Sequence, residues 1–468
     1  MNYHRLTYIC AKTIEWSLVF IVAAVPLIIN PAAFDLWYRP KIASVQALLL
    51  IAGIAWLTKI LVSRRGLHWQ WTPLTISILC FAAAAVFSTI FSINAGLSFF
   101  GDPLRLEGLL TIATYLMLVF LFSENVQTPE TVDRLFFWLL LAATLVSSYA
   151  LFQYFYYNPT EHFFYKYSPK GNGVGSTIGN PNFLGKYLVL IIPIVLALSL
   201  NGGSRLIMTG LFLSLTLCFA ALIATFTRAS WLGLLAGLAV LLYYAWRNAL
   251  LNGKGRRLVF IAISSVVIVC LFNTYSPAHG KRTAIPSPNQ TRGEVIQKAV
   301  KSLDIEKGRG VATRLYVWDK TVCLIRERPW FGYGLETFML VFKKYNQEYT
   351  EIFHDRVIID RAHNNYLDIA FAMGLPGLAT YLAILLSFVV QVWRLFKNLQ
   401  DRSNKMLVLG ILAGFCGYLI NDLFIFSVVS VSPTFWSLMG LTLAAGKLAR
   451  KEGCGIVCSV QNSAALAG

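Results

Sequence analysis

Residues 360–395 read DRAHNNYLDIAFAMGLPGLATYLAILLSFVVQVWRL. The first part of this stretch is polar, and no charged residue occurs between Asp368 and Arg394. An apolar run of about 20 residues is long enough to cross a bilayer as a helix. Arginine and histidine are energetically costly at the end of such a helix unless they face water, protein or a ligand. The stretch therefore predicts a transmembrane helix and a functional polar segment directly before it.

The composition of the whole chain is also typical of a membrane protein. Of its 468 residues, 57% are hydrophobic and 13% are charged, whereas charged residues make up about 25% of a soluble globular protein. The net charge of +18 fits basic cytoplasmic loops and contacts with anionic membrane lipid. No nucleic-acid-binding motif accompanies this charge, so nucleic acid is not an expected partner. The expected fold is an all-α polytopic membrane protein.

Apolar runs near the length that the hydrocarbon core requires predict about twelve transmembrane helices. They are residues 13–32, 42–62, 72–92, 106–123, 133–156, 183–200, 205–226, 230–246, 257–274, 375–395, 405–426 and 431–448. Lys and Arg gather in alternate short loops, which places these loops and both termini in the cytoplasm. Four other polar segments are then expected on the extracytoplasmic side of the inner membrane, and they are residues 93–105, 157–182, 226–229 and 275–362.

The chain is expected to divide into four parts. They are nine transmembrane helices in 1–274, a large and mainly helical extracytoplasmic loop in 275–362, a short surface helix with three further spans in 363–449, and a cytoplasmic tail in 450–468. In the loop, residues 276–291 are rich in Pro, Ser, Asn and Thr and are expected to be mobile. Apolar residues at helical spacing predict a helix over 311–327, and another is expected within 335–349.

The eight cysteines are interpreted as unpaired thiols. Several lie inside apolar runs, and Cys454 and Cys458 in the tail have no further ligand residues nearby. The first apolar run lacks a small-residue cleavage site, so no cleavable signal peptide is expected.

A motif with defined spacing begins in the polar segment before this predicted transmembrane helix. His363 and Asn364 are followed by nine residues, Gly374, two residues and Gly377. This pattern resembles the H-[NSQ]-x9-G-x-x-G signature of the O-antigen ligase (Wzy_C) superfamily. Further elements resembling that family lie within 175–395, at residues 179–182, 225–233, 313–318 and 329–334.

The resemblance implies a GT-C-like glycosyltransferase that uses neither a cofactor nor a metal. Such an enzyme would move a glycan, with inversion, from undecaprenyl diphosphate to an acceptor such as lipid A core, a pilin or another surface polymer. Arg228 and Arg314 would grip the diphosphate and stabilise the leaving group, because a guanidinium is always charged and forks onto phosphate oxygens. His363 would act as general base on the acceptor hydroxyl, or orient it.

Each of these three residues also has a structural interpretation. Arg228 could extend to the lipid headgroups, and Arg314 could belong to the solvated face of a helix. His363 could cap the following helix, or be a hydrogen-bonded polar residue at the interface.

Two further candidates for substrate binding lie outside the motif. Arg105 lies at the extracytoplasmic start of a predicted helix. It either contacts phosphate or pairs with Asp102 or Glu107. Asn180 belongs to a Gly-Asn-Pro-Asn element that the resemblance places on the same side.

Two more candidates for substrate binding flank His363. Arg361 either contacts substrate or pairs with Asp360 or Asp368. Asn364 is expected to cap the following helix or to support His363.

Some polar and small residues are expected to shape the bundle rather than react. Gly374 and Gly377 would let a short helix over 364–373 turn into the next span. Asn421 and Asp422 lie near the end of a span, where a polar pair usually faces protein or a cavity. They could line a lipid groove.

Three other functions compete with glycan ligation. A Wzy-type polymerase would use the same donor and another lipid-linked repeat as acceptor. A bicarbonate or small-anion transporter should show an internal repeat and charged residues at the bilayer midplane, whereas the notable polar residues here gather on one side. A membrane scaffold would leave the arginine and histidine set unexplained.

Overall fold

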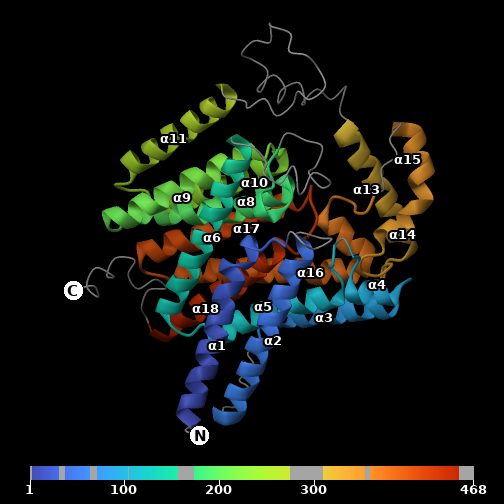
Figure 1. Cartoon of the computed structure of the whole chain (residues 1–468), viewed down its shortest axis with the longest axis horizontal. Coiled ribbons are helices and arrows are strands. Elements are labelled where there is room, and N and C mark those ends of the chain that lie inside the picture. Colours follow the sequence, from blue (N-terminus) through green and yellow to red (C-terminus); the bar gives the residue numbers. More distant parts are fainter. Residues whose placement is uncertain are drawn as a thin grey trace.

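A computed structural model describes residues 3–30, 37–63, 71–103, 105–155, 173–274, 309–353 and 359–452. Within these residues the chain forms helices and no strand (Figure 1). The segment 276–291 and the pair Cys454 and Cys458 lie outside the described residues, so their predictions stay open. The described cysteines are free thiols.

The helices follow one another along the chain without long interruptions in the described parts. They are α1 (Tyr3–Ala23), η1 (Val25–Leu27), α2 (Tyr38–Ser63), α3 (Pro73–Ile90), α4 (Ala95–Phe100), α5 (Leu109–Asn125), α6 (Pro129–Phe155), η2 (Ser176–Ile178), α8 (Pro181–Asn201), α9 (Arg205–Ala224), α10 (Arg228–Arg247), α11 (Gly255–Thr274), α13 (Arg309–Glu327), α14 (Phe338–Phe342), η4 (Lys343–Tyr345), α15 (Asn346–Phe353), α16 (Asn365–Asn398), α17 (Arg402–Asn421) and α18 (Ser432–Glu452).

The prediction of an all-α polytopic membrane protein is confirmed. Each predicted span overlaps a helix, and ten helices of the described residues are long and apolar enough to cross a membrane. The count is below twelve because α5 has only 17 residues and α18 is rich in Ser, Thr and Gly and ends in basic residues. The bounds of the first span were wrong, because α1 begins at Tyr3 rather than at residue 13.

Helix α8 forms the centre of the bundle. Of the residues in its most apolar 18-residue stretch, 94% are buried, whereas 11% are buried in the corresponding stretch of α11. A helix that is hydrophobic all round is suited to such a position, and α8 packs against α9, α10 and α17. Close approach of α10 to α17 depends on glycine, because a Cβ at Gly233 would lie 2.6 Å from the carbonyl oxygen of Gly417.

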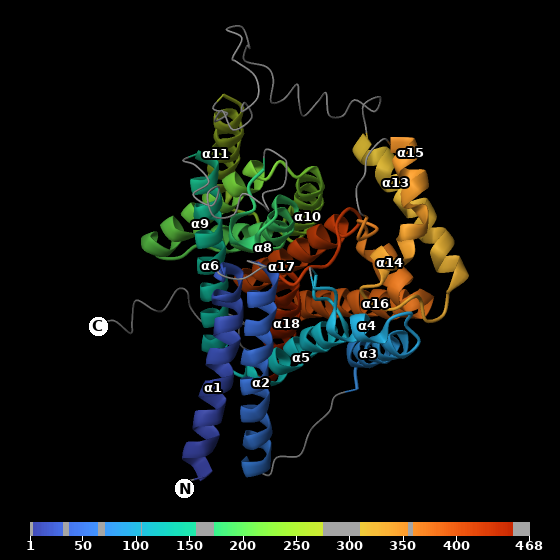
Figure 2. The same cartoon turned by 45° about the vertical axis from the view of Figure 1, so that its right-hand side comes forward.

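The helices α13, α14 and α15 gather beside α16 at one end of the molecule, as Figures 1 and 2 show. The predicted helix 311–327 is confirmed as α13, which ends just before Arg328-Pro329 because proline disfavours a helical residue before it. The single helix expected within 335–349 was wrong, since α14, η4 and α15 share this region. Backbone bonds from Tyr333 and Gly334 to residues 371 and 372, both 3.0 Å, fasten the loop after α13 to α16.

Helix α16 has a kink at Gly374. This residue has φ 69° and ψ −176°, a conformation that only glycine adopts readily. A Cβ there would lie 2.5 Å from the carbonyl oxygen of Trp330, and the amide of Leu375 donates to the carbonyl of Pro329 at 2.7 Å. The expected short helix that turns into a span is therefore present, and it presents residues 360–364 at the end of the bundle.

Candidate active site

His363 lies at a tightly fixed turn before α16. Its φ is +53°, in the left-handed region that few residues other than glycine adopt. The next residue, Asn364, caps α16 by accepting the amides of Tyr366 and Leu367 at 3.0 and 3.2 Å. On the other side, Trp318 of α13 donates its indole N–H to the carbonyl of Ala362 at 2.9 Å. These contacts confirm the capping interpretation of Asn364 and hold His363 between α13 and α16.

Arg314 lies in the electrostatic surroundings of His363, and Arg228 lies in those of Arg314. Arg314 is half-buried on α13, one turn before Trp318. Burial lowers its pKa, and the positive charge of Arg228 lowers it further, which places these two guanidinium groups close to each other. Arg314 also lowers the pKa of His363. Arg314 of α13 thus lies near Arg228 of α10 and near His363 in the turn before α16.

Arg228 is the first residue of α10 and is exposed. The preceding Thr227 donates its hydroxyl to Asn182 at 3.4 Å. Asn180 caps α8 by accepting the amide of Asn182 at 2.9 Å. The Gly-Asn-Pro-Asn element therefore adjoins the turn that presents Arg228, and Asn180 itself has a structural role as a helix cap.

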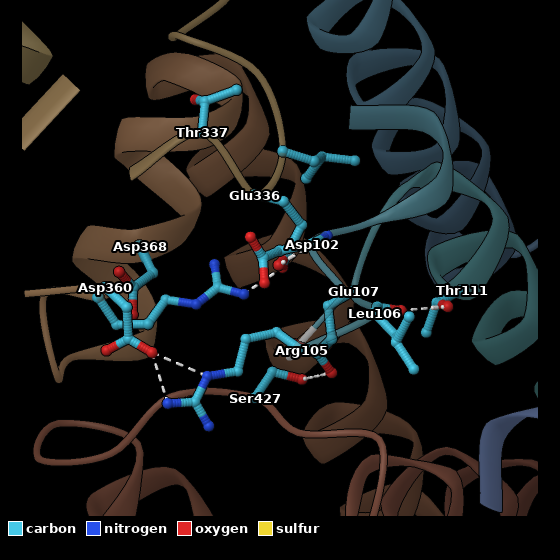
Figure 3. Close-up of polar contacts among 12 residues, drawn as sticks. Asp102, Arg105, Leu106, Glu107, Thr111, Glu336, Thr337, Asp360, Asp368 and Ser427 are labelled. Atoms are coloured by element: carbon cyan, nitrogen blue, oxygen red, sulfur yellow. Dashed lines mark hydrogen bonds and ion pairs between the residues drawn. The ribbon is translucent and has the colours of Figure 1, made fainter. Parts of the chain in front are cut away.

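Arg105 is bound to an acidic residue that the sequence interpretation did not pair with it. Its Nε and Nη2 donate to Oδ2 of Asp360 at 2.9 and 2.5 Å, as Figure 3 shows. The expected partners, Asp102 and Glu107, were wrong. The fold instead places Asp360, which is 255 residues away in the sequence, within hydrogen-bonding distance of Arg105. Burial alone would raise the pKa of Asp360, but the charge and hydrogen bonds of Arg105 outweigh it and lower this pKa.

Arg361 points away from solvent, toward a buried cluster of carboxylates. Its Nη2 donates to Glu336, a partner that neither expected alternative, Asp360 or Asp368, had included. Burial would lower the pKa of Arg361, but Glu336, Asp368 and Glu107 raise it above its ordinary value. The side chain is only 11% exposed, so a direct contact with substrate would require this ion pair to open.

A cavity of about 90 Å³ lies beside this cluster. Its polar wall includes Glu107, Glu336, Arg361 and Asp368, and tyrosine and tryptophan side chains form much of the rest. Oδ2 of Asp368 and Nε of Arg361 have no hydrogen-bond partner in the protein, and the space suffices for several water molecules. Glu336 was not predictable from the sequence, because it lies 25 residues from the arginine it binds.

Phe426 is a central contact of the site that sequence reasoning missed. Its ring lies 5.3 Å from the His363 ring, and the guanidinium carbons of Arg105 and Arg361 lie 4.9 and 5.8 Å from its centroid. An aromatic face attracts cations and excludes water beneath them. A phenylalanine in an apolar sequence carries no signal that would distinguish it from a core residue.

The surroundings of His363 favour its neutral form. Burial, together with the charges of Arg314 and Arg105, lowers its pKa to about 4, although Asp360 partly opposes them. The ring is nevertheless exposed, so contact with water weakens the effect of burial without reversing its direction. An uncharged imidazole has a free lone pair, so His363 can accept a proton or a hydrogen bond near neutral pH.

The polar pair near the end of α17 faces protein. Asn421 and Asp422 are both fully buried, and their partners are side chains of neighbouring helices. This agrees with the first expectation for the pair and removes the suggestion that it lines a lipid groove. Among the residues that the structure describes, no group of three or more His, Cys, Asp or Glu is placed to hold a metal ion.

Together these features define a class: a polytopic membrane protein with a site suited to an anionic substrate, made of arginines and one neutral histidine. The family model described as O-antigen ligase matches residues 212–382, a range that contains Arg228, Arg314 and His363. Over this range the chain resembles the O-antigen ligase family. No curated protein matches the chain in sequence.

Proposed function

We propose that the protein transfers a glycan from undecaprenyl diphosphate to a hydroxyl of an acceptor. The observation that carries the proposal is that Arg314 lies near both Arg228 and His363 at one end of the helical bundle, in surroundings that favour the neutral form of His363. Two guanidinium groups provide the charge and the forked donors that a diphosphate requires. A neutral histidine beside them provides the base that an acceptor hydroxyl requires.

The proposed reaction is a single displacement. His363 takes the proton of the acceptor hydroxyl while the acceptor oxygen forms a bond to the anomeric carbon. The bond between this carbon and the diphosphate oxygen breaks, and its electron pair stays on the diphosphate. Arg228 and Arg314 stabilise the charge that grows on this leaving group. Attack from the face opposite the diphosphate inverts the anomeric centre.

The other candidates have supporting roles in this proposal. Arg105 is partly exposed and can offer its free N–H groups to phosphate while it remains bound to Asp360. Arg361 and Asn364 are held by protein contacts, which favours positioning of the turn at His363 over binding of substrate. Asn180 supports the neighbouring turn of Arg228 in the same way.

A ligase and a Wzy-type polymerase would use this site in the same manner, and they differ only in the acceptor. The extracytoplasmic location of the site in the inner membrane is part of the proposal, because lipid-linked glycans are presented there. A transporter of small anions is the alternative from another class. The position of the arginines at one end of the bundle supports surface chemistry over passage through the membrane.

Transfer in liposomes tests the proposal. Purified protein is mixed with polyprenyl-diphosphate-linked glycan and acceptor, and product is measured by mass spectrometry. His363→Ala should lower the rate by about 10²–10⁴-fold, because it removes a general base, and Arg228→Ala should have a comparable effect through the lost charge on the leaving group.

The matched control is Arg326→Ala. Arg326 is exposed on the same helix as Arg314 and lies about 18 Å further along its axis, so its loss should leave the rate unchanged. Full transfer by folded His363→Ala protein would refute the site. Uptake of a small anion into the liposomes without any glycan transfer would favour the transporter.

A further inference from the structure

Lys186 and Asp422 form an ion pair inside the helical bundle. Both side chains are completely buried, in a region where isolated charges are costly and usually mark function. Lys186 lies on α8, and its Nζ also donates to the carbonyl of Phe426 at 3.1 Å. It lies 4.3 Å from the centroid of the Tyr418 ring as well. The ammonium group of Lys186 thus contacts an acidic side chain, a carbonyl and an aromatic ring next to the candidate site.

Asp422 connects this pair to the turn of His363. Its carbonyl accepts the amide of Asn365 at 2.8 Å, and its Oδ2 accepts the side-chain amide of Asn365 at 3.1 Å. Asn365 in turn accepts the amide of Ser427 at 3.2 Å. Because Asn365 is two residues after His363, these bonds fix the start of α16 against the end of α17 and the loop that carries Phe426.

The same end of α17 reaches the helix that carries Arg228. Asn421 donates its side-chain amide to the hydroxyl of Ser230 at 2.9 Å, and both residues are completely buried. Ser230 lies two residues after Arg228 on α10, and a Cβ at Gly185 of α8 would lie 2.3 Å from its hydroxyl oxygen. Three helices therefore meet at the level of the ion pair with little space between them.

We propose that the Lys186–Asp422 pair is a positioning device that fixes His363 relative to Arg228. Replacing a buried ion pair by apolar residues often leaves stability intact or raises it, so stability alone is a weak reason for such a pair. A pair that fixes registry between elements is the better attested use. Here it fixes α8 to the end of α17. That end is bonded through Asp422 to the turn of the proposed base and through Asn421 to the helix of the proposed leaving-group arginine, and the inference rests on the proposed function in that respect.

Hydrogen exchange and kinetics test the proposal separately. The variant Lys186→Met/Asp422→Leu removes both charges without leaving either unpaired, and Asp422→Asn serves as a second, isosteric variant. Lys41→Met is the matched control, because Lys41 is also a completely buried lysine but binds the carbonyls of Val25, Pro26 and Ile28 instead.

For the double variant, the amides of residues 362–368 should exchange at least about tenfold faster than in the wild type. The turnover number should fall at least about tenfold while KM for the lipid-linked donor changes by less than about threefold. Asp422→Asn should show the same pattern to a smaller extent, and Lys41→Met should show neither change.

Unchanged exchange over residues 362–368 in both folded variants would overturn the proposal, as would an unchanged turnover number. If wild-type protein transfers no glycan but exchange still rises in the double variant, the positioning role stands and the proposed function fails. The two inferences can therefore fail independently.

Discussion

The protonation state of His363 depends more on its neighbours than on its own side chain. Dense protein and the arginines lower its pKa, whereas Asp360 raises it. Asp360 is itself held by Arg105, so one ion pair supplies opposing charges to the same imidazole. The proposed base is neutral above its lowered pKa, and activity should be lost only as the pH falls through that value.

Substitution at this ion pair should move the pKa of His363 in opposite directions. Asp360→Asn removes the group that raises this pKa and should lower it further, whereas Arg105→Gln removes a group that lowers it and should raise it toward the ordinary value of about 6.5. The titration of ¹⁵N-labelled histidine by NMR measures both shifts, with the signal assigned by its loss in His363→Ala. Shifts of the same sign in the two variants would contradict the electrostatic account.

At the scale of the elements, the kink of α16 determines where His363 lies. The turn at Gly374 brings α16 against the loop after α13, and Leu375 is bonded to Pro329. Gly377 allows close packing in the next turn, since a Cβ there would lie 2.3 Å from that of Met373. The two glycines of the motif therefore shape the helix, and no reactive role needs to be assigned to them.

Gly374→Ala should destabilise the protein by about 1–3 kcal/mol, because the backbone conformation there is disfavoured for any L side chain. The nearby carbonyls of Pro329 and Trp330 are backbone groups and cannot move aside easily. Thermal unfolding in detergent should show a lower Tm. The matched control, Gly210→Ala in α9, has open space around it and should stabilise its helix by up to about 1 kcal/mol. Equal Tm values for Gly374→Ala and the wild type would contradict this role of Gly374.

The sequence was sufficient for features that depend on local rules. Proline at 329 indicated the end of α13, the His-Asn pair indicated a helix start, and Gly374 indicated a turn. The partners of the charged residues were not predictable in this way. Arg105 and Asp360 are 255 residues apart, and Lys186 is 240 residues from the carbonyl of Phe426.

Distant pairing of this kind follows from the packing of helices against each other, which one sequence does not reveal. A single sequence shows only which charged residues are near each other along the chain, and it therefore favours local partners such as Glu107 for Arg105. The helix pattern was easier to predict, since each apolar run is long enough to signal its own element.

At the scale of the whole molecule, the buried α8 and its neighbours support a polar end built from parts that are far apart in the chain. The segment before α5, the start of α10, α13, the turn before α16 and the loop after α17 all contribute residues to this end. Figure 2 shows α13, α14 and α15 standing beside α16 there. A helical bundle that presents one charged end fits the function proposed above.

The predicted orientation places that end outside the cytoplasm, and Cys323 can report on it. Cys323 is an exposed free thiol on α13. In a variant that retains only this cysteine, a membrane-impermeant maleimide should label intact cells. A cysteine placed at Asn248, in a basic loop expected inside, should react only after the membrane is permeabilised. The reverse pattern would contradict the topology.

The most direct test of the central claim is the fate of the lipid-linked glycan in cells. A deletion strain is complemented with the wild-type protein or with His363→Ala, and polyprenyl-linked and acceptor-linked glycans are measured by mass spectrometry. The account predicts that His363→Ala cells accumulate lipid-linked glycan and lack the acceptor-linked product. Accumulated full-length polymer would identify a ligase, and accumulated single repeats a polymerase. Unchanged levels of both glycan pools in the deletion strain would contradict the account.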